Sequence, residues 1–124
     1  MSGLLKREAS RKEYIRTIKN YIYDHPSGNI TVQEIAQYMH LNRQYVSELF
    51  TRHTGIPIRD YILKMRMRRA KMMLRRGYTV GECAELTGYA NIYSFSKAFK
   101  KVCGVTPSHY SLTISQTDKG TLLV

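Results

Sequence analysis

Apolar side chains recur every three or four residues along most of this chain, which is the spacing of amphipathic helices. Ile15, Ile18 and Ile22 form the first apolar stripe and predict a helix from about Lys12 to His25. Two shorter helices follow, separated by a turn at residues 40–42. Their predicted inward side chains are Ile35, Ala36 and Met39 in one helix, and Val46, Leu49 and Phe50 in the other.

A longer fourth helix is predicted from Pro57 to Arg76. Proline suits the first turn of a helix, where its missing amide hydrogen costs nothing, and Gly77 suits the end. Its apolar stripe consists of Leu63, Met67, Ala70 and Leu74, broadened by Ile62 and Met73. Its other faces carry basic side chains, namely Arg59, Lys64, Arg66, Arg68, Arg69, Lys71, Arg75 and Arg76.

Three further helices complete a prediction of an all-α fold with seven helices over residues 12–110. The fifth helix follows Thr79, and the seventh is short, running from a Thr106 cap and Pro107 to Tyr110. The buried residues expected on the fifth and sixth helices are Cys83, Ala84, Leu86, Phe95 and Phe99.

Three segments are predicted to lie outside these helices. Residues 1–11 form a loose, charged lead-in, and Asp24–Asn29 form a turn that contains Pro26 and Gly28. The tail at residues 111–124 is predicted to be disordered, because it is polar apart from its last apolar residues.

The chain also repeats itself at an interval of about 48 residues. Residues 31–36 (TVQEIA) recur as residues 79–84 (TVGECA), and both copies begin with Thr-x-x-Glu. This motif predicts a capping box, in which the Thr and Glu side chains each bind the other residue's backbone amide. Further on, Phe50 and Gly55 recur as Phe99 and Gly104. A helix, a short turn and a second helix in each copy are the order of a helix-turn-helix unit.

The composition favours a polyanionic partner. There are 20 Lys and Arg residues against 9 Asp and Glu, giving a formal charge of +11 and a pI near 9.9. This excess fits a nucleic acid or an anionic membrane. The apolar fraction of 43% is ordinary for a globular protein, and no apolar run approaches the roughly 20 residues needed to span a bilayer. No secretory leader is expected in the first ten residues, and a reduced cytoplasmic protein is predicted.

Catalysis and metal binding are not expected. The four histidines (His25, His40, His53 and His109) and the two cysteines are scattered, without ligand spacing. There is no grouping of Ser, His and Asp and no glycine-rich phosphate loop. We therefore predict no enzyme activity, no metal and no cofactor.

Residues 88–110 (GYANIYSFSKAFKKVCGVTPSHY) resemble the signature of AraC/XylS-type transcription regulators. An earlier stretch is similar to the linker helix of that family, through Tyr61, Ile62, Arg66, Met67, Ala70, Met73 and Leu74. The similarity covers about residues 13–111, with every helix in order. It departs from the family at Ser111, where an Arg is common, and at His40, where helix-turn-helix units commonly have glycine.

The resemblance implies two homeodomain-like helix-turn-helix subdomains at residues 31–54 and 79–103, joined by a linker helix at 57–76. It implies a sequence-specific regulator of transcription in bacterial cytoplasm, an activator, that binds double-stranded promoter DNA. RNA polymerase is a further implied partner, and many similar proteins carry an additional domain that senses a small molecule or dimerises. The residues that match the structural core of the motifs are Ala36, Phe50, Arg66, Ala84, Phe95 and Phe99.

The linker gives a spacing for two reading helices. About 18 residues at roughly 1.5 Å each span about 27 Å, near the roughly 34 Å of one DNA turn. Two recognition helices at that separation would enter adjacent major-groove segments on one face of the duplex. A single chain is therefore predicted to bind an asymmetric site as a monomer.

The predicted base-reading residues lie on the outward faces of the third and sixth helices. They are Gln44, Ser47 and Glu48 on the third helix, and Asn91, Ile92, Tyr93, Ser96 and Lys97 on the sixth. Gln44 suits adenine, Glu48 a cytosine amino group, Ile92 and Tyr93 thymine methyl groups, and Lys97 a guanine edge. The predicted phosphate contacts, which add affinity without sequence information, are Arg43, Arg52, Lys100 and Lys101.

Other roles remain open for several of these residues. Glu48 could instead pair with Arg52 four residues on, and Arg66 could be buried and paired with Glu34 or Glu82. Any single Lys or Arg could simply be solvated. For the whole chain, the alternatives are a nonspecific or RNA-binding basic module and membrane binding through the cationic fourth helix.

Overall fold

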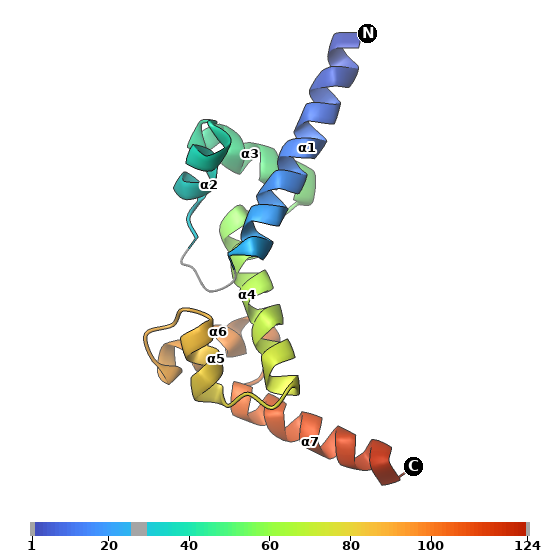
Figure 1. The fold of residues 1–124 in the computed structure, drawn as a ribbon, viewed down its shortest axis with the longest axis vertical. Coiled ribbons are helices and arrows are strands. Elements are labelled where there is room, and N and C mark those ends of the chain that lie inside the picture. The colour runs from blue at the N-terminus through green and yellow to red at the C-terminus, as the bar shows by residue number, and fades with distance from the viewer. Residues whose placement is uncertain (1, 26–29, 124) are drawn as a thin grey trace. The chain divides into compact units, whose positions relative to one another are not determined.

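The computed structural model describes residues 2–25 and 30–123. This described part contains seven helices and no strand (Figure 1), which confirms the predicted fold class. The helices are α1 (Ser2–Asp24), α2 (Val32–Met39), α3 (Arg43–Thr54), α4 (Ile58–Arg75), α5 (Val80–Leu86), α6 (Ile92–Cys103) and α7 (Pro107–Leu123).

The chain divides into two compact units, Met1–Met65 and Arg66–Val124. The first unit holds α1, α2, α3 and the beginning of α4, and the second holds the rest of α4 with α5, α6 and α7. Each unit therefore contains one predicted helix-turn-helix pair, α2 with α3 or α5 with α6.

The two ends of the chain correct the prediction. Residues 2–11 belong to α1 rather than to a loose lead-in, and residues 111–123 belong to α7 rather than to a tail without structure. Neither segment contains proline, and residues 4–9 (LLKREA) are strong helix formers. Adding a residue to an existing helix is far easier than starting one, so a polar sequence without a stop signal can continue it. The turn predicted through Pro26 and Gly28 lies outside the described residues.

The core of the first unit is formed by aliphatic side chains and one phenylalanine. Its buried members are Ile18, Ile22, Ile35, Ala36, Val46, Phe50, Ile58 and Ile62. α1 packs against α3, and α2 packs against α3 (Figure 1). The ring of Tyr61 from α4 meets Phe50 edge-on, with 5.2 Å between ring centroids. These contacts bury the inward face of α3 and leave its other face to solvent.

The core of the second unit is built around a row of aromatic rings. Tyr89, Phe95, Phe99 and Tyr110 follow one another at centroid separations of 5.7, 5.8 and 5.7 Å. Both phenylalanines are fully buried. The other buried residues in this unit are Met67, Ala70, Met73, Leu74, Cys83, Ala84, Thr87 and Pro107.

One predicted apolar contact is wrong. Leu86 is 45% exposed, because α5 ends there and the next inward position belongs to Thr87. The hydroxyl of Thr87 donates to the carbonyl oxygen of Cys83 at 2.6 Å, which satisfies this buried polar group.

The two turns have the same backbone form despite different residues. His40 has φ 56°, and Gly88 at the corresponding place has φ 84°. In both turns the next amide donates to the mid-helix alanine carbonyl, from Leu41 to Ala36 and from Tyr89 to Ala84, each at 2.9 Å. His40 thus adopts the left-handed conformation at the place where helix-turn-helix units commonly have glycine, and the cost of its side chain there is tolerated.

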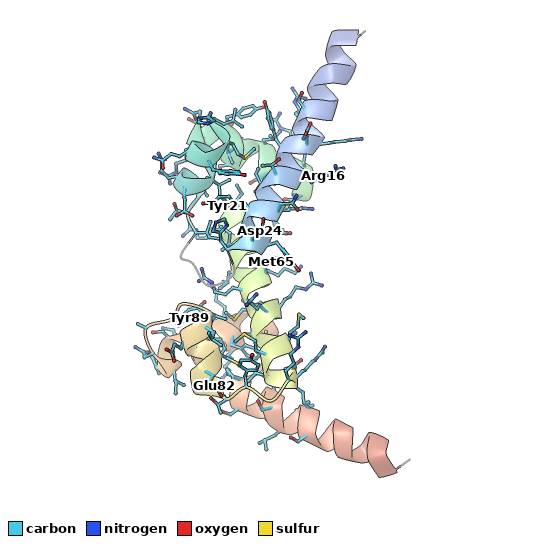
Figure 2. The ribbon with its side chains drawn as sticks, viewed as in Figure 1. Arg16, Tyr21, Asp24, Met65, Glu82 and Tyr89 are labelled. Atoms are coloured by element: carbon cyan, nitrogen blue, oxygen red, sulfur yellow. The ribbon has the colours of Figure 1, made fainter. Side chains whose placement is uncertain are left out.

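The predicted capping box is complete in only one of the two repeats. At α5, the hydroxyl of Thr79 accepts from the amide of Glu82 at 3.1 Å, and the Glu82 carboxylate accepts from the Thr79 amide at 3.0 Å. At α2, Thr31 accepts from the Glu34 amide at 3.1 Å, but the carboxylate of Glu34 accepts from the hydroxyl of Tyr21 at 2.8 Å (Figure 2 labels Tyr21 and Glu82).

This difference predicts an acid-sensitive cap in the second unit. The amide of Thr79 stabilises the Glu82 carboxylate and lowers its pKa. A carboxyl with a lower pKa in the folded state stabilises the fold above its unfolded pKa of about 4.3, and this is lost as pH falls through the folded pKa. We expect Glu82→Gln to flatten the dependence of unfolding free energy on pH below about 5. Chemical denaturation measured from pH 7 to 3 tests this.

The matched control is Glu85→Gln, an exposed glutamate later on the same helix. It removes one negative charge but no capping bond. A control variant that flattens the pH profile as strongly as Glu82→Gln would contradict the prediction.

Candidate nucleic-acid interface

The two predicted recognition helices, α3 and α6, begin and end in the same way. Each starts after an asparagine cap: Asn42 accepts from the amides of Gln44 and Tyr45, and Asn91 accepts from the amide of Ser94. Each ends at a glycine, Gly55 with φ 82° or Gly104 with φ 86°. An added Cβ at either glycine would meet nothing within 4 Å, so only the backbone conformation requires glycine there.

On α3, the predicted base-reading residues lie away from the buried face. Gln44 and Glu48 are exposed, whereas Ser47 is half-buried. The side-chain amide of Gln44 donates to Oε1 of Glu48 at 3.1 Å. The structure thus brings two predicted base-reading side chains together on one face of α3. One of them offers a hydrogen-bond donor group and the other an acceptor group. Their contact with bases stays a prediction.

The alternative partner for Glu48 differs from the observed one. Arg52 lies one turn further along α3, but among the described residues no ion pair joins it to Glu48. Arg43 and Arg52 are both exposed and belong to the set of predicted phosphate contacts. A hydrogen bond between exposed groups is weak and exchanges easily with water or with another partner. Glu48 therefore remains available to accept from a base.

On α6, the predicted base-reading residues are more apolar than those on α3. Ile92 is 52% exposed and Tyr93 is 74% exposed, both in the first turn of the helix. Lys97 is exposed one turn later, and Ser96 is half-buried. The predicted phosphate contacts Lys100 and Lys101 are exposed in the last turn.

Asn91 has a role that the prediction missed. Its side-chain oxygen accepts from the amide of Ser94 at 2.8 Å, which caps α6. Asparagine directly before an amphipathic helix is a strong capping signal, and Asn42 shows the same signal before α3. The oxygen of Asn91 therefore uses one of its two lone pairs within the protein, and the amide hydrogens and the second lone pair are left to meet a base.

Arg66 lies beside an aromatic ring. It is half-buried, and its guanidinium carbon is 5.5 Å from the ring centroid of Tyr89, a cation–π arrangement. Tyr89, in the turn between α5 and α6 (Figure 2), also meets Phe95. The two carboxylates proposed for Arg66 accept hydrogen bonds from Tyr21 and Thr79. Arg66 thus supports the turn before α6, and its pairing with a carboxylate stays a prediction.

A residue that sequence reasoning missed is Gly81 in the first turn of α5. A Cβ added to it would lie 3.5 Å from Cδ1 of Ile92. The Ile92 side chain therefore lies beside the first turn of α5 at a position where Gly81 has no side chain. The only signal in the sequence is that the first repeat has Gln33 at the corresponding position.

The described residues offer no metal cluster and no membrane span. No group of three or more His, Cys, Asp or Glu side chains among them could hold a metal ion. Within the same residues no helix is both long and apolar enough to cross a bilayer. Burial raises the pKa of the Cys83 thiol to about 11, so this cysteine is a neutral core residue at neutral pH.

Comparisons with known proteins agree with this geometry. Residues 35–112 match a family model described as a helix-turn-helix domain. The Msm operon regulatory protein of Streptococcus mutans is 31% identical over 111 residues, which are 89% of this chain and 40% of that protein. The chain thus spans two fifths of the length of this curated relative.

Two solved structures share the arrangement of helices. The C-terminal domain of AraT, a response regulator from Geobacillus stearothermophilus, has a TM-score of 0.77 and 31% identity, covering 81% of this chain and 84% of that one. The DNA-binding domain of AdpA, a global transcriptional factor solved with a target DNA, has a TM-score of 0.73 and 19% identity, covering 80% and 90%. At this identity the likeness to AdpA shows the fold alone.

Proposed function

Given that this chain belongs to the AraC-type family of helix-turn-helix DNA-binding domains, we propose that it binds specific double-stranded promoter sites and regulates transcription as an activator. α3 and α6 each enter one major-groove segment, and the two segments are adjacent. The observation that carries the proposal is that each of these helices buries one face and exposes the predicted base-reading side chains on its other face. RNA polymerase is the proposed second partner, and the bacterial cytoplasm the proposed location.

The charge supports duplex binding over other activities. A formal charge of +11 favours association with a polyanion, and exposed lysines and arginines flank both recognition helices. Phe95 and Phe99 are fully buried, so they offer no stacking platform for single-stranded bases. The proposed role is therefore in binding and not in catalysis.

A titration against duplexes tests the proposal. Sites are first selected from a random duplex pool, and the affinity of the best sequence is compared with that of a scrambled one at several salt concentrations. We expect log affinity to fall with log salt at a slope near −0.9 per phosphate neutralised. The selected site should bind about 10³-fold or more tightly than the scrambled one. Equal affinity for all duplexes, or for single strands, would reject specific duplex binding.

Lys97 and Lys100 are expected to differ in their effects. Lys97→Ala should relax discrimination at one base position, at a cost of about 1–3 kcal/mol for the preferred sequence. Lys100→Ala should weaken all duplexes alike and lower the salt slope by about 1. Both variants remove one exposed charge from the same helix, so each is the control for the other. Base-by-base affinity measurements decide between the two behaviours, and identical profiles would contradict the assignment.

A further inference from the structure

The first turns of the two recognition helices differ in chemistry. α3 begins with Arg43 and Gln44, whereas α6 begins with Ile92 and Tyr93 at the corresponding positions. The Asn42 and Asn91 caps fix this correspondence, because each precedes its helix directly. The start of α3 therefore offers hydrogen-bonding groups, and the start of α6 offers mainly carbon.

The side chain of Ile92 lies beside the first turn of the neighbouring helix α5. Its Cδ1 lies 3.5 Å from the position that a Cβ at Gly81 would take, an ordinary van der Waals distance, so a side chain longer than alanine at position 81 would compete with Ile92 for this space. The rest of the side chain is 52% exposed. A β-branched side chain has few rotamers, which limits the positions that this apolar group can take. Ile92 is thus an exposed apolar group with a defined position.

Exposed apolar groups in the first turn of a recognition helix have one matching feature in the major groove. Among the four bases only thymine presents a methyl group there, at C5, and the main recognition features of the other bases are hydrogen-bond donors and acceptors. Removing a methyl group and an isoleucine from water together is favourable, whereas placing isoleucine against a polar edge is not.

We infer that α6 reads its part of the DNA site through thymine C5-methyl groups, with Ile92 as the contacting residue and Gly81 as its positioning residue. This inference rests on the proposed function and adds a chemical class of base contact to one of the two recognition helices. It also makes the two halves of the site different in kind, since α3 has no apolar group in the corresponding first-turn positions.

Replacing thymine by uracil tests the inference, because it removes only the methyl group. Each test duplex carries uracil at one thymine position of the selected site. The base position at which Lys97→Ala relaxes discrimination identifies the part of the site that α6 contacts. We expect at least one uracil within a few base pairs of that base to lower affinity about fourfold. Uracil in the other half of the site should leave affinity within about twofold.

Ile92→Ala separates a direct methyl contact from an effect of DNA shape. If Ile92 makes the contact, this variant binds the thymine and uracil duplexes equally. Gly81→Gln, which places the residue of the first repeat beneath Ile92, should also reduce the preference for thymine. Gly81→Ala is its matched control, since a Cβ at 3.5 Å is in ordinary contact and should preserve the preference. Circular dichroism melting of each variant checks that the second unit is folded.

Failure of the inference is distinct from failure of the proposed function. Sequence-specific binding without any effect of uracil would leave the proposed function standing and overturn the methyl contact. A uracil effect of equal size in Ile92→Ala would show that the methyl acts without Ile92, and would also overturn it. Uracil effects confined to the other half of the site would have the same consequence.

Discussion

Replacing Phe99 by alanine is expected to lower the free energy of unfolding of the second unit by about 3–5 kcal/mol. Phe99 is fully buried, and its ring lies between those of Phe95 and Tyr110 at 5.8 and 5.7 Å. The substitution removes both ring contacts and leaves a cavity at the junction of α6 and α7. A domain of this size has only about 5–15 kcal/mol of stability, so much of it would be lost.

Thermal and denaturant unfolding measure the effect, with amide hydrogen exchange to assign it to one unit. Val102→Ala is the control on the same helix, because Val102 is exposed and should cost well below 1 kcal/mol. Amides of the first unit should keep their protection in Phe99→Ala, since the two units are separately compact. A decrease in the free energy of unfolding of less than about 1 kcal/mol would show that the row of aromatic rings contributes little to the stability of this unit.

Lys64→Pro is expected to lower affinity by about 10²-fold or more for a DNA site with two boxes, where a box is the segment contacted by one recognition helix. Lys64 is exposed in the interior of α4, where proline removes a helical hydrogen bond and clashes with the preceding turn. If α4 is a rigid linker, breaking it removes the advantage of binding both boxes through one chain, an advantage of about 10²–10⁴. Affinity for a single box should change little.

Lys64→Ala is the matched control, since it removes the same charge and preserves the helix. The DNA offers an independent test, because inserting about 5 base pairs turns one box to the opposite face of the duplex. This insertion should strongly weaken DNA binding by the unsubstituted protein and only slightly weaken binding by the Lys64→Pro variant. A proline variant that binds the two-box site as well as Lys64→Ala would contradict the rigid linker.

Local patterns were sufficient to predict the order and the buried faces of the helices. The apolar spacing placed Ile18, Val46 and Phe99 in the core, and the repeated cap and glycine signals marked where α3 and α6 begin and end. The left-handed turn at His40 lies at the place where helix-turn-helix units commonly have glycine. The beginning of α1 and the end of α7 were not predicted, because a polar sequence without proline gives no period and no stop signal.

Within the candidate site, the sequence indicated which side chains are outward but not what they contact. Gln44 and Glu48 are one helical turn apart, so their hydrogen bond was within reach of a local argument. The capping role of Asn91 was also locally visible and was missed. The proximity of the Ile92 side chain to the first turn of α5 at Gly81 was not visible, because the two residues belong to different helices separated by a turn.

The two Thr-x-x-Glu motifs show where local information ends. The sequence by itself determined that both could cap a helix, and Thr31 and Thr79 do accept from the amide three residues on. Only the tertiary structure decided that Glu82 closes its capping box while Glu34 binds the hydroxyl of Tyr21. Periodicity and caps depend on residues within one or two turns of each other, whereas the partner of an outward side chain is set by which other helix packs beside it.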